Sequence, residues 1–288
     1  MRVFITGAEG QLGRDCVKEA QRRGWEAIGV DRGDFDLTDD FDTIFALCQA
    51  RPDAVLHCAA YTAVDQAESE PERALAVNAK AVAPVAVYCA GEDIPWVYVS
   101  TDYVFDGSGG APRDVDAVPA PLNVYGRTKL GGEFYAASCG GKCMIVRTSW
   151  VFGQGGNNFV KTMLRLGAGR EEIRVVDDQI GSPTYTVDLA RLLCDMLGRP
   201  VPGVYHATNA GYCSWAEFAR EIMRRAGLPA RVVPIPSSEF PQAAERPKNS
   251  RLSCAGLARA GYEALPTWED ALGRFLGEIN PCCNGSYT

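Results

Sequence analysis

Two side chains able to move a proton lie four residues apart, in the segment Tyr125-Gly-Arg-Thr-Lys129. If residues 124–138 form a helix, the two share one face, because positions i and i+4 are neighbours there. A free phenol has a pKa of about 10 and is a poor acid near neutrality, but an adjacent cation stabilises its anion and lowers that pKa. We therefore predict that Tyr125 is a general acid whose pKa is lowered by Lys129. The hydroxyl pair Ser100-Thr101 lies upstream in the sequence.

The amino terminus combines a short apolar strand, a glycine-rich turn and a helix. Residues 2–6 are centred on the apolar run Val3-Phe-Ile5, and Gly7, Gly10 and Gly13 follow in the spacing G-x-x-G-x-x-G. Glycines let the backbone approach a pyrophosphate closely, and the N–H groups of the following helix favour its negative charge. The spacing departs from the commonest fingerprint, G-x-G-x-x-G, but its place at the start of a strand-turn-helix unit predicts a dinucleotide site.

A second predicted strand, residues 25–30, ends on Asp31. A carboxylate there is placed to accept hydrogen bonds from the adenosine ribose and repels a 2′-phosphate, which favours NADH. Arg32 follows directly and can pair with that phosphate, which favours NADPH. Because the two neighbours act in opposite directions, we predict that the protein uses both NADH and NADPH. Asp36 and Leu37 follow where an adenine can be held.

The composition is that of an ordinary globular protein. The chain has 288 residues, 47% of them apolar, and a formal net charge of −7. Because no basic patch is present, we expect neither a nucleic acid nor an anionic membrane as a partner. No apolar stretch reaches the length of a membrane span, and the amino terminus leads directly into a predicted strand. These features predict a cytoplasmic protein, either a monomer or a homodimer.

The cysteine and histidine content favours a reduced protein without zinc. Eleven cysteines, an odd number, are scattered along the chain, which indicates free thiols rather than a disulfide framework. With only two histidines and no C-x-x-C pair, no zinc site is expected. Cys282-Cys283, in the terminal tail, is assigned no role.

Strands alternate with helices along the first half of the chain. Apolar runs at 53–58, 96–100 and 142–148 predict strands, and the S-x-x-E pattern from Ser69 predicts a capping box that opens a helix to about Ala90. This alternation predicts an α/β fold with a Rossmann-type, doubly wound parallel sheet. Ligands bind beyond the carboxyl ends of such strands, so the residues that follow each strand should converge on one edge.

After about residue 150 the pattern loosens into short elements. We predict a dinucleotide-binding domain over 1–150 and a smaller, mixed α/β part over 151–288 that mainly binds substrate. Elements around 172–207 are expected to return to the first domain. The other elements predicted here are strands at 173–176 and 204–207, a helix opened by a capping box at Ser214 and reaching Ala226, an extended proline-rich segment at 233–241 and a terminal helix from Thr267.

With these motifs in order, the chain resembles an extended short-chain dehydrogenase/reductase and, more narrowly, the dTDP-4-dehydrorhamnose reductase family. The resemblance spans nearly the whole chain. The stretches that carry it are Ala59-Ala-Tyr-Thr-Ala-Val-Asp65, Ser100-Thr-Asp-Tyr-Val-Phe105, Pro121-Leu-Asn-Val-Tyr-Gly126, Arg147-Thr-Ser-Trp150, Asn157-Asn-Phe159, Asp178-Gln179 and Arg246-Pro-Lys-Asn-Ser-Arg-Leu252.

The resemblance implies a role for each site residue. Tyr125 would donate a proton, Lys129 would also hold the nicotinamide ribose, and Thr101 would hydrogen-bond the substrate carbonyl. The other cofactor residues would be the pyrophosphate turn with Gly7, Gly10, Gln11, Leu12 and Gly13, the adenosine contacts Asp31, Arg32, Asp36 and Leu37, and the nicotinamide-side residues Ala60, Tyr61 and Thr62. The other substrate residues would be the sugar contacts Asp102 and Trp150 and the diphosphate partners Arg246 and Arg251.

The implied reaction is reduction of the C4 ketone of dTDP-4-dehydro-L-rhamnose to dTDP-L-rhamnose by NADPH or NADH. Hydrogen bonds from Thr101 and Tyr125 would stabilise the charge that develops on the ketone oxygen. Structural alternatives remain for several residues: Trp150 as core, Asp102 as an organiser of its loop, and Arg251 as the partner of a nearby helix. Asn78 is interpreted as a structural hydrogen-bonding residue.

Two other function classes remain open. A sugar-nucleotide epimerase or dehydratase shares the fold and the Tyr/Lys pair, although a dehydratase should carry an acidic residue where Tyr103 stands. A regulatory subunit resembling the β-subunit of methionine adenosyltransferase would be a binding module without catalysis. Some members of the resembled family are magnesium-linked dimers. Asp15 and Glu278 could serve such a metal here, but Val187 stands where the middle carboxylate is expected, so a bridging Mg²⁺ is not predicted.

Overall fold

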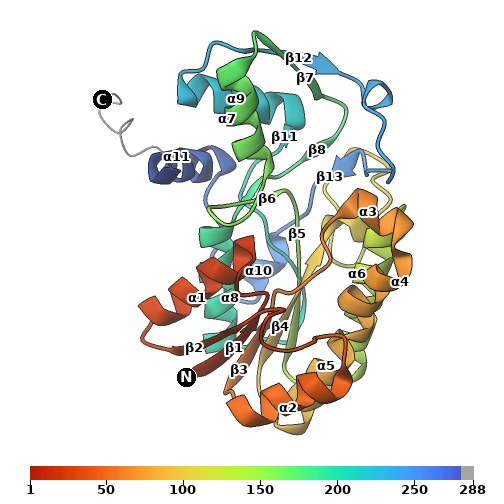
Figure 1. The fold of residues 1–288 in the computed structure, drawn as a ribbon, viewed down its shortest axis with the longest axis vertical. Helices are drawn as coiled ribbons and strands as arrows, with labels where there is room; N and C mark the ends of the chain where they lie inside the picture. Colours follow the sequence, from red (N-terminus) through yellow and green to blue (C-terminus); the bar gives the residue numbers. More distant parts are fainter. Residues whose placement is uncertain (280–288) are drawn as a thin grey trace.

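The computed structural model describes residues 1–279 of the chain, which are built around a six-stranded parallel sheet (Figure 1). The strand order is β10-β5-β4-β3-β1-β2, and every neighbouring pair is parallel. The predicted Rossmann-type, doubly wound sheet is therefore confirmed. The strands are β1 (Arg2–Thr6), β2 (Glu26–Val30), β3 (Ala54–His57), β4 (Trp96–Thr101), β5 (Cys143–Thr148) and β10 (Gly203–His206).

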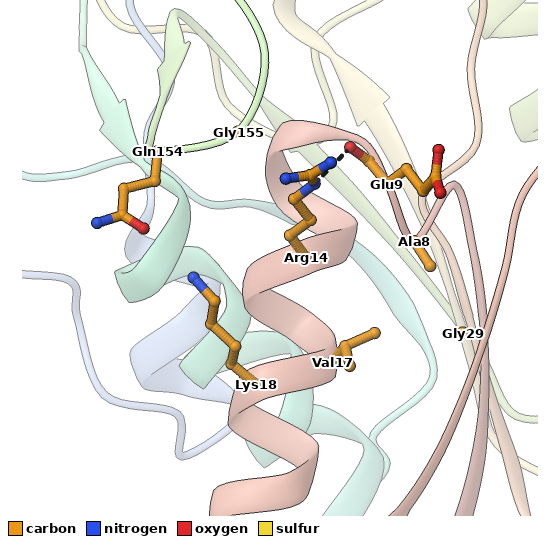
Figure 2. A pocket seen from close by; sticks show the side chains of 8 residues that line it. All are labelled: Ala8, Glu9, Arg14, Val17, Lys18, Gly29, Gln154 and Gly155. Atoms are coloured by element: carbon orange, nitrogen blue, oxygen red, sulfur yellow. Dashed lines mark hydrogen bonds between the residues drawn. The ribbon is translucent and has the colours of Figure 1, made fainter.

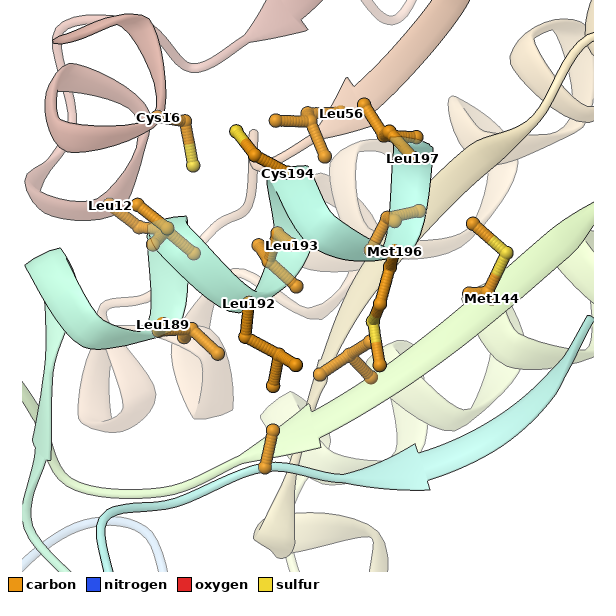
Figure 3. Packing of buried hydrophobic residues seen from close by; sticks show 14 of the residues in the cluster. Leu12, Cys16, Leu56, Met144, Leu189, Leu192, Leu193, Cys194, Met196 and Leu197 are labelled. Carbon is orange, nitrogen blue, oxygen red and sulfur yellow. The ribbon is translucent and has the colours of Figure 1, made fainter. Parts of the chain in front are cut away.

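Helices cover both faces of this sheet, because successive side chains of each buried strand point to opposite sides and both sets are apolar. On one face Val3, Leu56 and Met144 pack with residues of α1 and α8 (Figure 3). On the other face Phe4 and Trp96 pack with residues of α2, α5 and α6. These helices are α1 (Gln11–Arg22), α2 (Asp40–Ala50), α5 (Val82–Gly91), α6 (Val124–Ser138) and α8 (Thr186–Gly198).

The first strand-turn-helix unit requires its glycines. Gly7 has a φ of +66°, in the left-handed region that glycine adopts without strain. A Cβ atom on Gly13 would lie 2.0 Å from the carbonyl oxygen of Gly7, so α1 approaches the turn too closely for any side chain at position 13. Arg14 Nε donates to the carbonyl of Glu9 over 2.9 Å and closes the outer side of the turn (Figure 2).

The helix predicted from Ser69 to about Ala90 is confirmed in its length and end, since a helical run extends over Pro71–Gly91, but its predicted start at Ser69 is wrong. Ser69 ends the preceding helix, α3 (Val64–Ser69), and its hydroxyl donates to the carbonyl of Gln66 instead of capping the next helix. The following run contains α4 (Pro71–Leu75), a π-helical turn η1 (Ala76–Lys80) and α5. Local back-bonding by a serine competes with its capping role, and sequence spacing alone does not reveal which prevails.

The run 71–91 also corrects the expectation that no stretch is long enough to span a membrane. It has 21 residues, and an 18-residue window within it has a mean hydropathy of 1.4, enough by length and composition alone. Half of its apolar window is buried inside the fold, where α5 packs against α2 and α6. A helix that packs in a protein core has the same composition, so this run is weak evidence for a membrane.

The carboxyl half builds a second lobe above the edge of the main sheet (Figure 1). Its core joins three helices and three small sheets, in which β7 pairs with β12, β6 pairs with β9, and β8 lies between β11 and β13. The elements of this half are β6 (Val151–Phe152), α7 (Phe159–Gly169), β7 (Glu172–Val176), β8 (Ile180–Gly181), β9 (Thr184–Tyr185), β11 (Cys213–Ser214), α9 (Trp215–Ala226), β12 (Arg231–Ile235), η3 (Ser237–Glu239), β13 (Asn249–Ser250), α10 (Ala255–Arg259) and α11 (Trp268–Ile279).

Several expectations for this half can be compared with the structure. The capping box at Ser214 and Glu217 is confirmed, with both reciprocal hydrogen bonds present and the helix ending at Ala226. Of the elements expected to return to the main sheet, α8 and β10 do so, whereas β7 stays in the upper lobe. The segment 233–241 is not extended throughout, because β12 gives way to the short helical turn η3. Cys282 and Cys283 lie outside the described residues.

Candidate active site

Tyr125 and Lys129 lie in the first two turns of α6, at the carboxyl edge of the sheet. Asn123 begins this helix, because its side-chain oxygen accepts a hydrogen bond from the N–H of Gly126 over 2.8 Å. A Cβ atom on Gly126 would lie 2.2 Å from the carbonyl oxygen of Tyr103, so glycine lets α6 press against the turn that follows β4. The Tyr103 ring then meets the Tyr125 ring edge-on, with 5.5 Å between their centroids.

The structure joins Tyr125 to Thr101, the last residue of β4. The two side chains lie beside each other, and Thr101 Oγ1 lies 3.0 Å from Asp102 Oδ1 and accepts the N–H of Tyr103 over 3.2 Å. Burial raises the pKa of the Tyr125 phenol, and the neighbouring Thr101 hydroxyl opposes that rise. Three residues predicted separately from the sequence are thus in contact at one point.

Lys129 shares a helix face with Tyr125, as predicted, but its electrostatic effect differs from the prediction. Lys129 is buried, and its Nζ atom lies 4.1 Å from the centroid of the Tyr98 ring. Burial lowers the pKa of Lys129 to about 7, and the charge of Glu133 limits that fall. The expected lowering of the Tyr125 pKa by Lys129 is wrong for this structure, because burial dominates the phenol and raises its pKa.

Asp102 is the buried carboxyl of the site. Only 2% of the residue is exposed, and burial raises its pKa to about 6. Hydrogen bonds from Thr101 and Ser250 oppose that rise. Asp102 is therefore a buried carboxyl beside Thr101, and within residues 1–279 its Oδ2 atom has no hydrogen-bond partner.

Of the cofactor residues predicted after the second strand, Asp31 contacts the glycine turn, while Asp36 and Leu37 lie in the loop before α2. Asp31 Oδ2 accepts the N–H of Glu9 over 2.9 Å, which ties the end of β2 to the turn. Its other oxygen accepts the N–H of Arg32, whose side chain is exposed. Asp36 and Leu37 organise the loop before α2: Asp36 Oδ1 accepts from Thr38, and the Leu37 carbonyl accepts the hydroxyl of Thr43.

Residues 60–62 leave the end of β3 on the same edge of the sheet. The side chain of Asn78 accepts the N–H of Tyr61 over 2.8 Å and donates to its carbonyl over 3.1 Å. Asn78 also donates to the hydroxyl of Thr128 on α6. This confirms its interpretation as a structural residue, and it fixes the segment Ala60-Tyr61-Thr62 relative to the helix that carries Tyr125.

Trp150 lies under the upper lobe, in strained backbone. Its φ of +49° is rare for a bulky side chain, and such strain persists where surrounding contacts hold it. The Trp150 ring stacks on Trp215 with 3.5 Å between centroids, and a Cβ atom on Gly181 would lie 2.7 Å from it. The sequence does not indicate a role for Trp215, because nothing in its spacing links α9 to residue 150.

The two arginines predicted to bind a diphosphate lie in different surroundings. Both terminal nitrogens of Arg246 bond to Asp65 over 2.6 Å, and Arg246 also hydrogen-bonds Tyr103 beside Tyr125. Arg251 instead donates to the carbonyl of Gly110 and to Asn249, so the structure does not place it against the Thr101–Tyr125 contact. Asp65, the partner of Arg246, was missed as a functional residue although it belongs to a quoted motif.

A cavity of about 530 Å³ borders the outer face of the glycine turn (Figure 2). Arg14 and Lys18 extend from α1 beside the loop that carries Gln154 and Gly155. The loop lies close to Gln11, since a Cβ atom on Gly155 would lie 2.9 Å from the Cα atom of that residue. This cavity flanks the turn, and neither Tyr125 nor Thr101 lines it.

The candidate metal residues have other partners. Asp15 is buried, accepts the hydroxyl of Thr186 over 2.5 Å and pairs with Lys18 over 3.2 Å. Glu278 lies near Tyr185, while Val187 packs against the core of the upper lobe. Among residues 1–279 no group of three His, Cys, Asp or Glu side chains is arranged to hold a metal ion.

Comparison with known proteins identifies the family. The family model described as the RmlD substrate binding domain matches residues 1–280. A dTDP-4-dehydrorhamnose reductase of Streptomyces griseus is 42% identical, covering 94% of this chain and 91% of that protein. A dTDP-4-keto-6-deoxy-D-glucose reductase of Streptomyces niveus is 38% identical, covering 97% of this chain and 98% of that protein.

A solved structure agrees with these relatives. The crystal structure of dTDP-4-dehydrorhamnose reductase from Bacillus anthracis str. Ames, in complex with NADP, has a TM-score of 0.93 and 43% sequence identity, covering 96% of this chain and 99% of that one. Because a family model and full-length relatives agree along almost the whole sequence, the chain belongs to the RmlD family of dTDP-4-dehydrorhamnose reductases.

Proposed function

We propose that this protein reduces the C4 ketone of dTDP-4-dehydro-L-rhamnose to dTDP-L-rhamnose, with NADPH or NADH as hydride donor. The observation that carries the proposal is the contact of the Tyr125 phenol with the Thr101 hydroxyl at the carboxyl edge of the sheet. The relatives named dTDP-4-dehydrorhamnose reductase, and the NADP complex of one of them, support the substrate and the cofactor.

Tyr125 and Thr101 supply the chemistry of this chain. A ketone oxygen between the two hydroxyls accepts a hydrogen bond from each, and both bonds strengthen as negative charge develops on that oxygen. Tyr125 then transfers its proton to the oxygen and completes the alcohol. A raised phenol pKa suits this direction of reaction, because the phenol starts protonated and holds its proton until the alkoxide forms.

The cofactor site is proposed from residues that surround the glycine turn. Gly7, Gly10 and Gly13 let the backbone of the turn come close to the pyrophosphate, and Gln11 and Leu12 begin the helix whose dipole favours its charge. When bound, the reduced nicotinamide supplies the hydride. The remaining proposed contacts are Asp31, Arg32, Asp36 and Leu37 for the adenosine and Ala60, Tyr61, Thr62 and Lys129 for the nicotinamide side.

The substrate is proposed to lie between the sheet edge and the upper lobe. Asp102 and Trp150 would contact the sugar, while Arg246 would bind the diphosphate as a bidentate donor after exchanging Asp65 for phosphate oxygens. Arg251 is proposed as a second diphosphate contact. We further propose a nucleotide-binding part over 1–150, a substrate-binding part mainly over 151–288, and a cytoplasmic monomer or homodimer.

The direct test uses purified protein, dTDP-4-dehydro-L-rhamnose and each reduced cofactor. Loss of nicotinamide absorbance together with formation of dTDP-L-rhamnose supports the proposal. Turnover of dTDP-4-keto-6-deoxy-D-glucose alone, giving a product with the opposite configuration at C5, would make that ketosugar the substrate. The name of the Streptomyces niveus relative points to this alternative. Absence of turnover with both ketosugars would refute the reductase function and favour a binding module.

A further inference from the structure

A buried carboxylate, Glu133, lies two helical turns beyond Tyr125 on α6. Tyr125, Lys129 and Glu133 occupy positions i, i+4 and i+8, so the three side chains follow one face of the helix. Glu133 is 6% exposed and is no part of the proposed contact with substrate or cofactor. Ionised side chains are rarely buried unless paired, so its partners define its role.

Two neighbouring strands hold Glu133 in place. Ser100 on β4 donates to Oε1 over 2.5 Å, and Arg147 on β5 donates to the two carboxylate oxygens over 2.9 and 2.7 Å. Ser100 and Arg147 stand opposite each other in the register of these strands. Ser100 also precedes Thr101, so the anchor of Glu133 and the hydroxyl proposed to bind the ketone share one strand.

In the described part of the chain, Glu133 is the carboxylate whose charge counteracts the effect of burial on Lys129. Across from Lys129 lie the Tyr98 ring on β4, the His57 imidazole at the end of β3 and the neighbouring Cys58 thiol. Burial lowers the pKa of His57 to about 3, with a further contribution from Lys129, so this ring is neutral at physiological pH. Glu133 is the carboxylate that raises the pKa of Lys129 against the effect of burial.

The charges in this region balance poorly without Glu133. Arg147 and Lys129 are both buried; Glu133 pairs with Arg147, and its charge also raises the pKa of Lys129. The nearby His206 ring adds no charge, because burial and Arg147 lower its pKa to about 3. Removal of one partner from a buried ion pair leaves the other charge uncompensated, and a lysine loses its proton more readily than an arginine does.

We propose that Glu133 is a positioning residue for Lys129: its carboxylate is anchored by Ser100 and Arg147 and lies one helical turn beyond Lys129 on the same face of α6. Its effect on turnover rests on the proposed reductase function, in which the Lys129 cation holds the nicotinamide ribose. Its effect on the Lys129 cation does not depend on that function and can be measured without substrate.

The first experiment titrates Lys129 by NMR in protein labelled with ¹³C-lysine. The chain has six lysines, and the Lys129 signal is assigned as the one missing from Lys129→Met. Glu133→Gln should lower the Lys129 pKa by about one unit or more, because an opposite charge nearby is lost. Arg147→Gln should raise it, because Glu133 then serves Lys129 alone. Because the two variants should shift the Lys129 pKa in opposite directions, either one tests the proposal if it folds.

A matched control removes a comparable carboxylate far from the site. Asp188 on α8 is 1% exposed and bonds both terminal nitrogens of Arg274 over 2.8 and 2.6 Å, so Asp188→Asn removes an equally buried carboxylate from a bidentate pair. It should leave the Lys129 titration unchanged. An unchanged Lys129 pKa in folded Glu133→Gln, or the same change in Asp188→Asn, would overturn the proposal.

The second experiment measures kcat/KM for ketone reduction against pH. Activity that needs the Lys129 cation is lost as pH rises through the Lys129 pKa, so Glu133→Gln should move this loss to lower pH. At about pH 8 the variant should be about tenfold slower than wild type, and Glu133→Asp, which keeps the charge, should recover most of the difference. A uniform loss at every pH would contradict a role through Lys129. An inactive wild type would refute the reductase function, and the NMR titration would still test Glu133.

Discussion

Thr101 Oγ1 lies 3.0 Å from Asp102 Oδ1, so the hydroxyl proposed to bind the ketone already has a buried carboxyl as its neighbour. The hydroxyl has one proton, which it can give either to Asp102 or to the ketone oxygen. A protonated Asp102 would leave that proton free for the substrate. The protonation of Asp102 therefore affects both the chemistry of the site and the stability of the fold.

Asp102→Asn should stabilise the protein above pH 6. The folded-state pKa of about 6 is raised above the ordinary value of 3.8, so the favourable contribution is complete below that ordinary value and is lost as pH rises through about 6. The amide removes this loss, and the gain at neutral pH is at most about 3 kcal/mol. Urea denaturation of wild type and variant between pH 4 and 7.5 measures the difference.

Asp106→Asn is the control, because it should change the stability at neutral pH in the opposite direction. Hydrogen bonds from Ser108 lower the pKa of Asp106, so its carboxylate stabilises the fold above its ordinary pKa and that contribution is lost as pH falls. Replacement should therefore reduce stability at neutral pH. A stability difference for Asp102→Asn that is the same at every pH would contradict the account of Asp102.

Gly13→Ala should abolish the cofactor site or the local fold around it. The new methyl would lie 2.0 Å from the Gly7 carbonyl, so the turn must open and its N–H groups lose their arrangement. NADPH binding, followed by fluorescence titration, should weaken by at least about tenfold, or about 1.4 kcal/mol. Gly91→Ala is the control, because its methyl meets nothing within 4 Å. Unaltered binding by Gly13→Ala would show that the dinucleotide lies elsewhere.

Asp31 and Arg32 should set the preference between the two cofactors in opposite directions. Asp31→Asn removes a charge that repels the 2′-phosphate and should raise the NADPH-to-NADH ratio of kcat/KM, whereas Arg32→Ala should lower it. Each change should be about tenfold, the size of one charge-assisted hydrogen bond. Equal ratios in wild type and both variants would exclude these residues from contact with the adenosine ribose.

The sequence predicted the sheet and the position of the Tyr125 helix because both depend on local patterns. Buried apolar strands read as continuous runs, and the glycines of the turn are required by backbone geometry that no other residue supplies. The proximity of Thr101 and Tyr125 could also be predicted from the sequence, because residues that follow parallel strands converge on one edge.

The remaining features depend on long-range packing. The raised Tyr125 pKa and the lowered Lys129 pKa follow from burial, which spacing along one helix does not reveal. The stack of Trp150 on Trp215 and the pairing of Arg246 with Asp65 join segments far apart in the chain. The start assigned at Ser69 failed because a serine can cap the next helix or bond back to the previous one.

The proton-donating role of Tyr125 is tested most directly by Tyr125→Phe beside Tyr135→Phe, a change of an exposed tyrosine on the same helix. With dTDP-4-dehydro-L-rhamnose and NADPH, Tyr125→Phe should fold and bind NADPH normally but lose about 10²–10⁴ in kcat, while Tyr135→Phe keeps wild-type turnover. A Tyr125→Phe protein with near wild-type kcat would contradict the account, because no other described side chain is given the task of protonating the ketone oxygen.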